Sequence, residues 1–221
     1  MMNIHANQRQ AKLPAHEVVY RKLRARVLFG EMAPGEAVTI QGIAEALGAG
    51  ITPVREAIRR LISESALVFQ DNRRVIVPEL NAGAIDELVT GRTALEPELA
   101  RRATLGLDQG VIAKLETVDA LLDKAIARGD VRGYLEHNYR FHDTLYAQAE
   151  APILRSLVDG LWLRFGPSLR VVCGRSGTLN LPDRHKELIA ALSRADAEAA
   201  ADAVRHDIQE GMSQVRAALD G

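Results

Sequence analysis

The sequence predicts a mainly α-helical protein in two parts, an N-terminal winged helix-turn-helix followed by an all-α helical bundle. Two observations lead to this prediction. Residues 40–66 have the pattern of two short helices joined by a glycine turn, and β-prone runs follow them. From Asn81 onward, alanine and leucine are abundant and the breaks are short. We therefore expect a flexible arm over residues 1–13, the winged helix-turn-helix over 14–78 and the bundle over 79–221.

The central helix pair is supported by apolar spacing and by turn residues. Gly48 is expected to end the first helix, because glycine tolerates the left-handed conformation of a helix C-terminus. Thr52 is a candidate N-cap for the second helix, and Pro53 suits its first turn. The apolar residues of the pair recur at the helical period: Ile40, Ile43, Ala44, Leu47, Val54, Ile58 and Leu61. The arginines of the second helix fall on other faces and are expected in solvent: Arg55, Arg59 and Arg60.

The flanking segments complete a winged helix-turn-helix. Residues 15–29 have apolar residues at fourfold spacing and end at Gly30, which predicts a preceding helix. Residues 67–69 and 75–77 are β-prone runs separated by Asp71-Asn72-Arg73-Arg74, which predicts a hairpin with a basic tip. A helix-turn-helix of this kind can place its second helix in the major groove of DNA.

The remainder of the chain is predicted to be a helical bundle. The apolar pattern places its helices at about 82–105, 109–128, 131–149, 151–173, 183–194 and 196–219. Pro167 lies inside the fourth of these helices and is expected to kink it, because proline removes a backbone hydrogen bond.

Composition is ordinary for a globular protein of one or two domains, with 47% hydrophobic and 26% charged residues among 221. Residues 1–78 contain 11 Lys or Arg against 7 Asp or Glu, whereas the remainder contains 17 against 22. A basic part joined to an acidic part is typical of a DNA-binding domain fused to a domain without DNA contacts, although so small an imbalance also arises by chance.

Cysteine content and hydropathy bear on location. Cys173 is the single cysteine, so an internal disulfide is excluded and a reducing cytoplasm is compatible. No apolar run approaches the roughly 20 residues that cross a bilayer, and residues 1–13 lack a signal-peptide core. We therefore expect a cytoplasmic protein without membrane association.

Arg92 and Glu96 lie on the apolar stripe of the first bundle helix, where charge is costly unless it is paired. One interpretation is an Arg92–Glu96 pair that is purely structural. The other is an arginine that binds an anionic ligand, since guanidinium holds a carboxylate in a bidentate fork.

Histidines on three bundle helices form a candidate metal site. Asn138 and His142 are four residues apart on an inward face, and His185 and His206 lie at similar distances from the turn between the last two helices. Three imidazoles and an amide oxygen would suit Zn²⁺ or another borderline transition metal. His206, however, falls opposite the strongest apolar stripe of its helix, so a surface histidine is the alternative.

The N-terminal part resembles the GntR family of transcription regulators. The segment PGEAVTIQGIAEALGAGITPVREAIRRL aligns without a gap to the family's DNA-binding signature, and TPVREAIRRL is its most specific portion. The resemblance implies that Arg55, Arg59, Thr52 and the wing residues Asn72 and Arg73 contact DNA. Gln41 and Ile51 depart from the family pattern at positions that contact DNA in relatives, where a charged residue and an arginine are usual.

The bundle resembles the FCD effector domain of the FadR subfamily. The segments that carry this resemblance are RTALEPELARRA, NYRFHDTLYAQAEAPIL and RHKELIAALSRADAEAAADAVRHDI. The resemblance implies that Asn138, His142, His185 and His206 bind a divalent metal, most often Zn²⁺, with Ni²⁺ and Mn²⁺ as alternatives. Asn138 replaces the more common aspartate, and Arg92 would contact the effector.

These features together predict a ligand-responsive regulator, expected to be a repressor, that binds a palindromic operator as a homodimer. Its effector would be a small organic acid or sugar acid bridging Arg92 and the metal. Two alternatives stay open: a metal-dependent enzyme, and a metal sensor without an organic effector.

Overall fold

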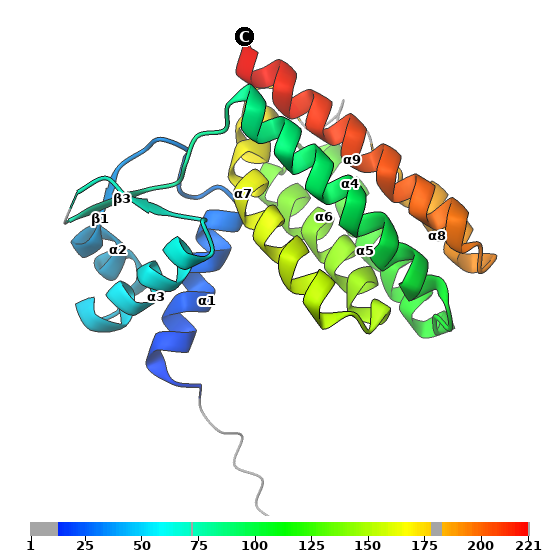
Figure 1. Cartoon of the computed structure of the whole chain (residues 1–221), viewed down its shortest axis with the longest axis horizontal. Coiled ribbons are helices and arrows are strands. Elements are labelled where there is room, and N and C mark those ends of the chain that lie inside the picture. Colours follow the sequence, from blue (N-terminus) through cyan, green and yellow to red (C-terminus); the bar gives the residue numbers. More distant parts are fainter. Residues whose placement is uncertain (1–12, 72, 178–182, 221) are drawn as a thin grey trace, which may run out of the picture.

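The computed structural model describes residues 13–71, 73–177 and 183–220. The N-terminal part consists of α1 (Ala15–Leu28), α2 (Ile40–Leu47), α3 (Ile51–Ser63) and a small antiparallel sheet. The strands are β1 (Val38–Thr39), β2 (Val68–Phe69) and β3 (Arg74–Ile76), in the order β1-β3-β2. This arrangement confirms the predicted winged helix-turn-helix, and the expected hairpin is β2–β3 (Figure 1).

Strand β1 is an addition to the sequence-based prediction. Its two residues pair with β3, Val38 opposite Val75 and Thr39 opposite Arg74. A strand of this length is too short to show an alternating pattern in the sequence. Thr39 also caps α2, because its Oγ1 accepts a hydrogen bond from the Gly42 N–H at 3.0 Å. At the other end of α2, Gly48 has a φ of 59°, the left-handed conformation expected there.

The prediction that Thr52 caps α3 is wrong. An N-cap residue has an extended backbone, and here Gly50 has it, with φ −70° and ψ 157°. Helix α3 therefore begins at Ile51, and Thr52 and Pro53 both lie in its first turn. The inward side chains of α3 are buried as predicted: Val54, Ile58 and Leu61.

The bundle helices lie close to their predicted positions. They are α4 (Ala82–Thr104), α5 (Gln109–Arg128), α6 (Val131–Tyr146), α7 (Pro152–Ser176), α8 (His185–Ser193) and α9 (Ala197–Asp220). The expected end of the third bundle helix is instead a short 3₁₀ helix, Ala147–Ala149. Helix α7 continues through Pro167, and its kink stays a prediction. Among the described helices, none is long and apolar enough to cross a membrane.

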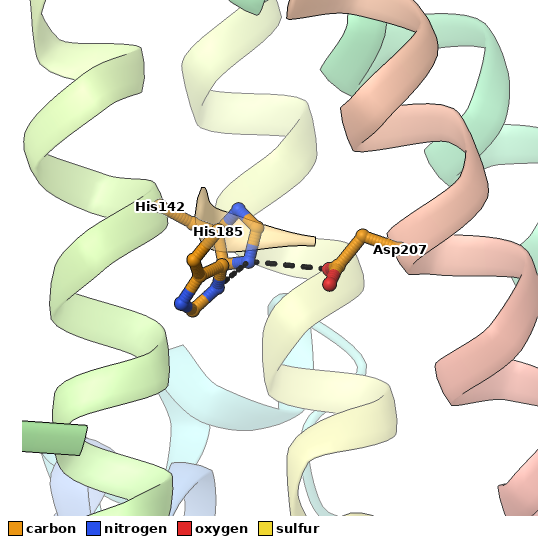
Figure 2. A group of neighbouring side chains, drawn as sticks. All are labelled: His142, His185 and Asp207. Atoms are coloured by element: carbon orange, nitrogen blue, oxygen red, sulfur yellow. Dashed lines mark hydrogen bonds and ion pairs between the residues drawn. The ribbon is translucent and has the colours of Figure 1, made fainter. Parts of the chain in front are cut away.

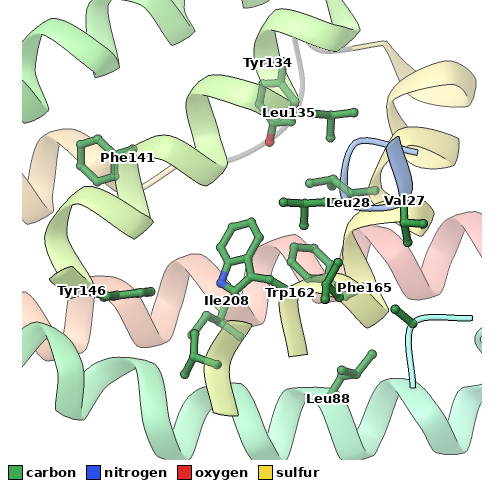
Figure 3. Close-up of a cluster of buried hydrophobic side chains, with 14 of the residues drawn as sticks. Val27, Leu28, Leu88, Tyr134, Leu135, Phe141, Tyr146, Trp162, Phe165 and Ile208 are labelled. Carbon is green, nitrogen blue, oxygen red and sulfur yellow. The ribbon is translucent and has the colours of Figure 1, made fainter. Parts of the chain in front are cut away.

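The two parts meet where α1 packs on α7 (Figure 1). A Cβ atom added to Gly166 of α7 would lie 2.5 Å from the carbonyl oxygen of Leu28, so glycine is required for this approach. Buried side chains of α1 and α7 belong to one continuous apolar cluster, which includes Val27, Leu28, Trp162 and Phe165 (Figure 3). The position of α7 therefore bears directly on the position of α1.

Candidate functional site

Three ligand-type side chains converge inside the bundle, from three different helices (Figure 2). His142 of α6 is 1% exposed, and His185, the first residue of α8, is fully buried. The Nε2 atoms of the two histidines are 3.2 Å apart, and His142 Nε2 is 3.4 Å from Oδ2 of Asp207 on α9. We call His142, His185 and Asp207 the His–His–Asp cluster.

The remaining ring nitrogens determine the histidine tautomers. His142 Nδ1 lies 3.2 Å from the Tyr146 hydroxyl, which donates its only proton to Glu96 at 2.8 Å. Burial first and the Glu96 charge second raise the pKa of Tyr146 well above its usual value, so the hydroxyl keeps that proton. The hydroxyl must therefore accept from His142 Nδ1–H, which leaves Nε2 of neutral His142 with a lone pair.

His185 is oriented in the same way by an acidic residue. Its Nδ1 lies 3.3 Å from Oδ1 of Asp119 on α5. Burial raises the pKa of this carboxyl, whereas the hydrogen bond from His185 and the charge of Lys186 lower it, and the net shift is downward. The Asp119 carboxylate accepts the Nδ1 proton, and two Nε2 lone pairs then face each other. Such carboxylate–histidine pairs are typical of metal-binding histidines.

Two facing lone pairs beside a carboxylate need a cation between them, and the spacing suits a metal ion. Ligands about 2.05 Å from a tetrahedral metal lie about 3.3 Å from one another. The 3.2 Å and 3.4 Å separations in the His–His–Asp cluster agree with that value. Burial raises the pKa of Asp207, but when the two histidines are protonated the hydrogen bond from His142 and the two histidine charges lower it to about 2, and a metal ion in place of those protons would supply the same positive charge. The carboxylate is therefore ionised and available as a ligand.

The four predicted ligands have different positions in the structure. His142 and His185 belong to the cluster, and Asn138 is buried one helical turn before His142. His206 is exposed on α9 and is not part of the cluster. Its predicted placement among the metal ligands therefore requires correction. The adjacent residue, Asp207, lies at the site because successive helical residues point about 100° apart.

Arg92 and Glu96 form a buried ion pair on α4. Arg92 Nε donates to Glu96 Oε1 at 2.5 Å, and Nη2 donates to Oε2 at 3.3 Å. Trp162 Nε1 also donates to Glu96, at 3.3 Å. The guanidinium carbon lies 4.9 Å from the Trp162 ring centre and 4.1 Å from that of Phe165, within cation–π range. The pairing that sequence analysis gave as one of two interpretations of Arg92 is therefore present.

A small cavity lies between this ion pair and the cluster. Its volume is about 30 Å³, which accommodates one or two waters. Its lining residues come from four helices: Arg92, Tyr134, Asn138, Trp162, Phe165, Leu169, Asp207 and Gly211. Arg92, Asn138 and Asp207 thus face a common space, and α7 supplies its apolar wall.

The second candidate site is the exposed face of α3. Arg55 and Arg59 are exposed, and neither forms an ion pair with any residue that the structure describes. Arg60, by contrast, is paired with Glu17 at 3.0 Å and Glu64 at 3.1 Å. The guanidiniums of Arg55 and Arg59 are therefore available to a polyanion, whereas that of Arg60 is already occupied.

The other predicted DNA-contacting residues lie around this face. Thr52 is exposed in the first turn of α3, and Gln41 is exposed on α2, where its Nε2 donates to Glu45 at 3.0 Å. Arg73 is exposed at the wing, and its backbone N–H donates to Asp71 at 2.7 Å. Asn72 lies outside the described residues.

Comparison with known proteins identifies both parts. The model of the family described as bacterial regulatory proteins, gntR family, matches residues 15–77, and the FCD domain model matches residues 87–210. The chain belongs to the GntR family. The HTH-type transcriptional regulator McbR of Escherichia coli (strain K12) is 31% identical over 199 residues, which cover 89% of this chain and 88% of McbR. The transcriptional repressor RspR of the same strain is 23% identical over 207 residues, 92% of this chain and 90% of RspR.

Solved structures agree with this assignment. The E. coli McbR/YncC structure has a TM-score of 0.88 at 27% identity, and the match covers 93% of this chain and 99% of that one. A GntR regulator from Rhodococcus sp. RHA1 has the same fold, with a TM-score of 0.73 at 23% identity over 91% and 97% of the two chains. This GntR-family chain is therefore a DNA-binding transcriptional regulator with an FCD domain, not an enzyme. Its place in the FadR subfamily stays a prediction.

Sequence reasoning missed several residues around the cluster of this regulator. Asp207 could have been found, because it follows the buried Val204 by three residues and so lies near the apolar stripe of α9. Asp119 also lies on the apolar stripe of its helix, four residues after Leu115, and Tyr146 follows His142 by one helical turn, but the sequence alone does not show that each supports a histidine of the cluster. Their roles follow only from the packing of α5 and α6 against their neighbours.

Proposed function

We propose that this regulator binds a divalent metal in its FCD domain and responds to a small organic or sugar acid there by changing its affinity for operator DNA. The observation that carries the proposal is the convergence of the His142 and His185 imidazoles with the Asp207 carboxylate, beside a cavity that Arg92 also lines. We further propose that it acts as a repressor.

The donor set supports a borderline transition metal. Two imidazole nitrogens with one carboxylate are typical ligands of Zn²⁺, and Ni²⁺ or Mn²⁺ would also accept them. Asn138 faces the same cavity and offers a neutral amide oxygen as a further ligand. The metal would supply a Lewis-acidic centre for an anionic ligand, and the positions not used by protein would be open to it.

The effector site would be the cavity between Arg92 and the cluster. One carboxylate could approach both the guanidinium and the metal, and charge-assisted hydrogen bonds of this kind are strong. The cavity of about 30 Å³ is smaller than an organic acid, so binding has to displace part of its wall. Trp162, Phe165 and Leu169 form that wall on α7.

Displacement of α7 offers a physical route to the DNA-binding part. Gly166 follows Phe165 directly and is in close contact with the Leu28 carbonyl at the end of α1. Helix α1 in turn packs on α3. A ligand that moves this turn of α7 would therefore favour one placement of α3 over another, which is the differential binding that allostery requires.

DNA binding would use α3 in the major groove and the β2–β3 wing on the adjacent backbone. A single small domain makes few contacts, so we propose a homodimer on a palindromic operator. In an electrophoretic shift assay at fixed salt, Arg55→Ala should abolish specific binding to a selected duplex. Arg60→Ala is the matched control on the same helix, and it should retain binding because Arg60 is already paired. Equal losses in both variants would contradict this assignment.

The effector part of the proposal is tested by a thermal-shift screen of small carboxylic and sugar acids on metal-loaded protein. A true effector should raise the melting temperature only when metal is present, and it should change operator affinity in the shift assay. Arg92→Lys should weaken this response, since lysine keeps the charge but loses the planar fork. A stabilising acid that binds equally well to metal-free protein would contradict the bridging arrangement.

A metal sensor without an organic effector is the second candidate. It is favoured by the completed Arg92–Glu96 pair and by the small size of the cavity. In that case metal alone would change operator affinity, and Arg92→Lys would leave the metal response intact.

A further inference from the structure

An apolar residue stands at the start of the DNA-facing stripe of α3. Ile51, Arg55 and Arg59 are spaced four residues apart, so they lie along one exposed side of the helix. The two arginines are free of ion pairs among the described residues. Ile51 precedes them at the first helical position, with 36% of its surface exposed.

The fold offers no reason for isoleucine at this position. Gly50, not Ile51, is the N-cap of α3, and the buried stripe of the helix begins at Val54. Ile51 does not belong to the apolar core or to the partly buried side chains packed against it in the described part of the chain. A β-branched residue also has a lower helix propensity than alanine. Single exposed aliphatic side chains are common on protein surfaces, and Ile51 is distinguished by its position at the start of the Arg55–Arg59 stripe.

We propose that Ile51 contacts the C5-methyl group of a thymine in the operator and so selects that base. The N-terminal residues of a recognition helix are those that reach base edges in the major groove. Among the four bases, only thymine presents a methyl group there, and apolar side chains recognise it by contact. An isoleucine forms no hydrogen bond to guanine or adenine, so the contact discriminates by shape and hydrophobicity.

This inference rests on the proposed docking of α3 in the major groove and specifies one base that it reads. Arg55 and Arg59 would supply charge-assisted contacts in any sequence context that positions phosphate or guanine near them. Ile51 adds a preference that is independent of salt, because burial of a methyl group involves no counterion release.

The test begins with selection of binding sequences from a random duplex library with wild-type protein. Each thymine of the selected half-site is then replaced by uracil, which removes only the methyl group. Loss of one buried methyl contact corresponds to about a fourfold loss of affinity. We expect one thymine at which uracil weakens wild-type binding about fourfold and leaves the affinity of Ile51→Ala unchanged.

Val18→Ala is the matched control, because Val18 of α1 has the same exposed fraction of 36% and lies outside the α3 stripe. It should show the wild-type response to uracil. The inference is overturned if every uracil substitution affects wild type and Ile51→Ala equally, or if the selected half-site contains no thymine that uracil weakens. Arg55→Ala separates the two proposals: if it keeps full specific binding, the docking of α3 itself is wrong.

Discussion

Two adjacent residues of α9 allow a sharp test of the metal centre. Asp207 belongs to the His–His–Asp cluster, whereas His206 is exposed on the neighbouring face. We predict that Asp207→Ala loses stabilisation by added metal and that His206→Ala keeps it. The physical reason is that one ligand atom from each of Asp207, His142 and His185 lies within 4.8 Å of the others, whereas His206 is not in this group among the described residues.

The expected size of the effect follows from binding linkage. Metal at about 100 times its Kd stabilises the native state by about 2.7 kcal/mol. For a chain of this length, that free energy corresponds to a rise in Tm of about 5–11 °C. If removal of the carboxylate lowers metal affinity about 100-fold, the same metal concentration contributes only about 0.4 kcal/mol, a rise of about 1 °C.

The assay is thermal unfolding after treatment with a chelator, followed by addition of Zn²⁺, Ni²⁺ or Mn²⁺. Each variant is compared with its own metal-free form, because Asp207 also accepts a hydrogen bond from the Arg184 N–H at 3.2 Å and its loss lowers stability by itself. Elemental analysis of the dialysed protein gives metal content independently of stability.

Two results would refute this reasoning. A full Tm rise in Asp207→Ala would show that the carboxylate is not a ligand. Loss of the rise in His206→Ala, with folding intact, would show that α9 presents His206 to the metal instead.

Three further predictions concern the surroundings of the cluster. Gly166→Ala should change operator affinity or effector response by disturbing the contact with α1, whereas Gly174→Ala on the same helix should not, because a Cβ there meets no atom within 4 Å; shift assays on both variants would decide. Arg92→Met and Glu96→Gln should each cost about 3–5 kcal/mol of unfolding free energy in urea titrations, and the double variant should cost less than their sum; additive values would count against a coupled pair. Asn138→Asp should raise metal affinity, since a carboxylate is a stronger ligand than an amide, and unchanged affinity in a metal titration would place Asn138 outside the ligand set.

Local chemistry in the sequence was sufficient to predict most of the fold. Helix α2 ends at Gly48 and α3 buries Val54, Ile58 and Leu61, because both features depend on backbone preference and on the 3.6-residue period. The same period places Arg92 and Glu96 one helical turn apart, so their pairing could also be foreseen.

Only the tertiary structure decided which side of α9 faces the site. Both sides of this helix were plausible from sequence, since one carries large apolar residues and the other small alanines. The packing of α9 along α4 and α8 determines its rotation, and that rotation brings Asp207 inward and leaves His206 outside. The support at Asp119 depends on packing in the same way, because Asp119 and His185 are 66 positions apart and meet only after the chain has folded. Tyr146 lies one turn from His142, but its hydroxyl is oriented by Glu96, 50 positions away. Periodicity is a property of one segment, whereas a site formed by several helices depends on how those segments pack together.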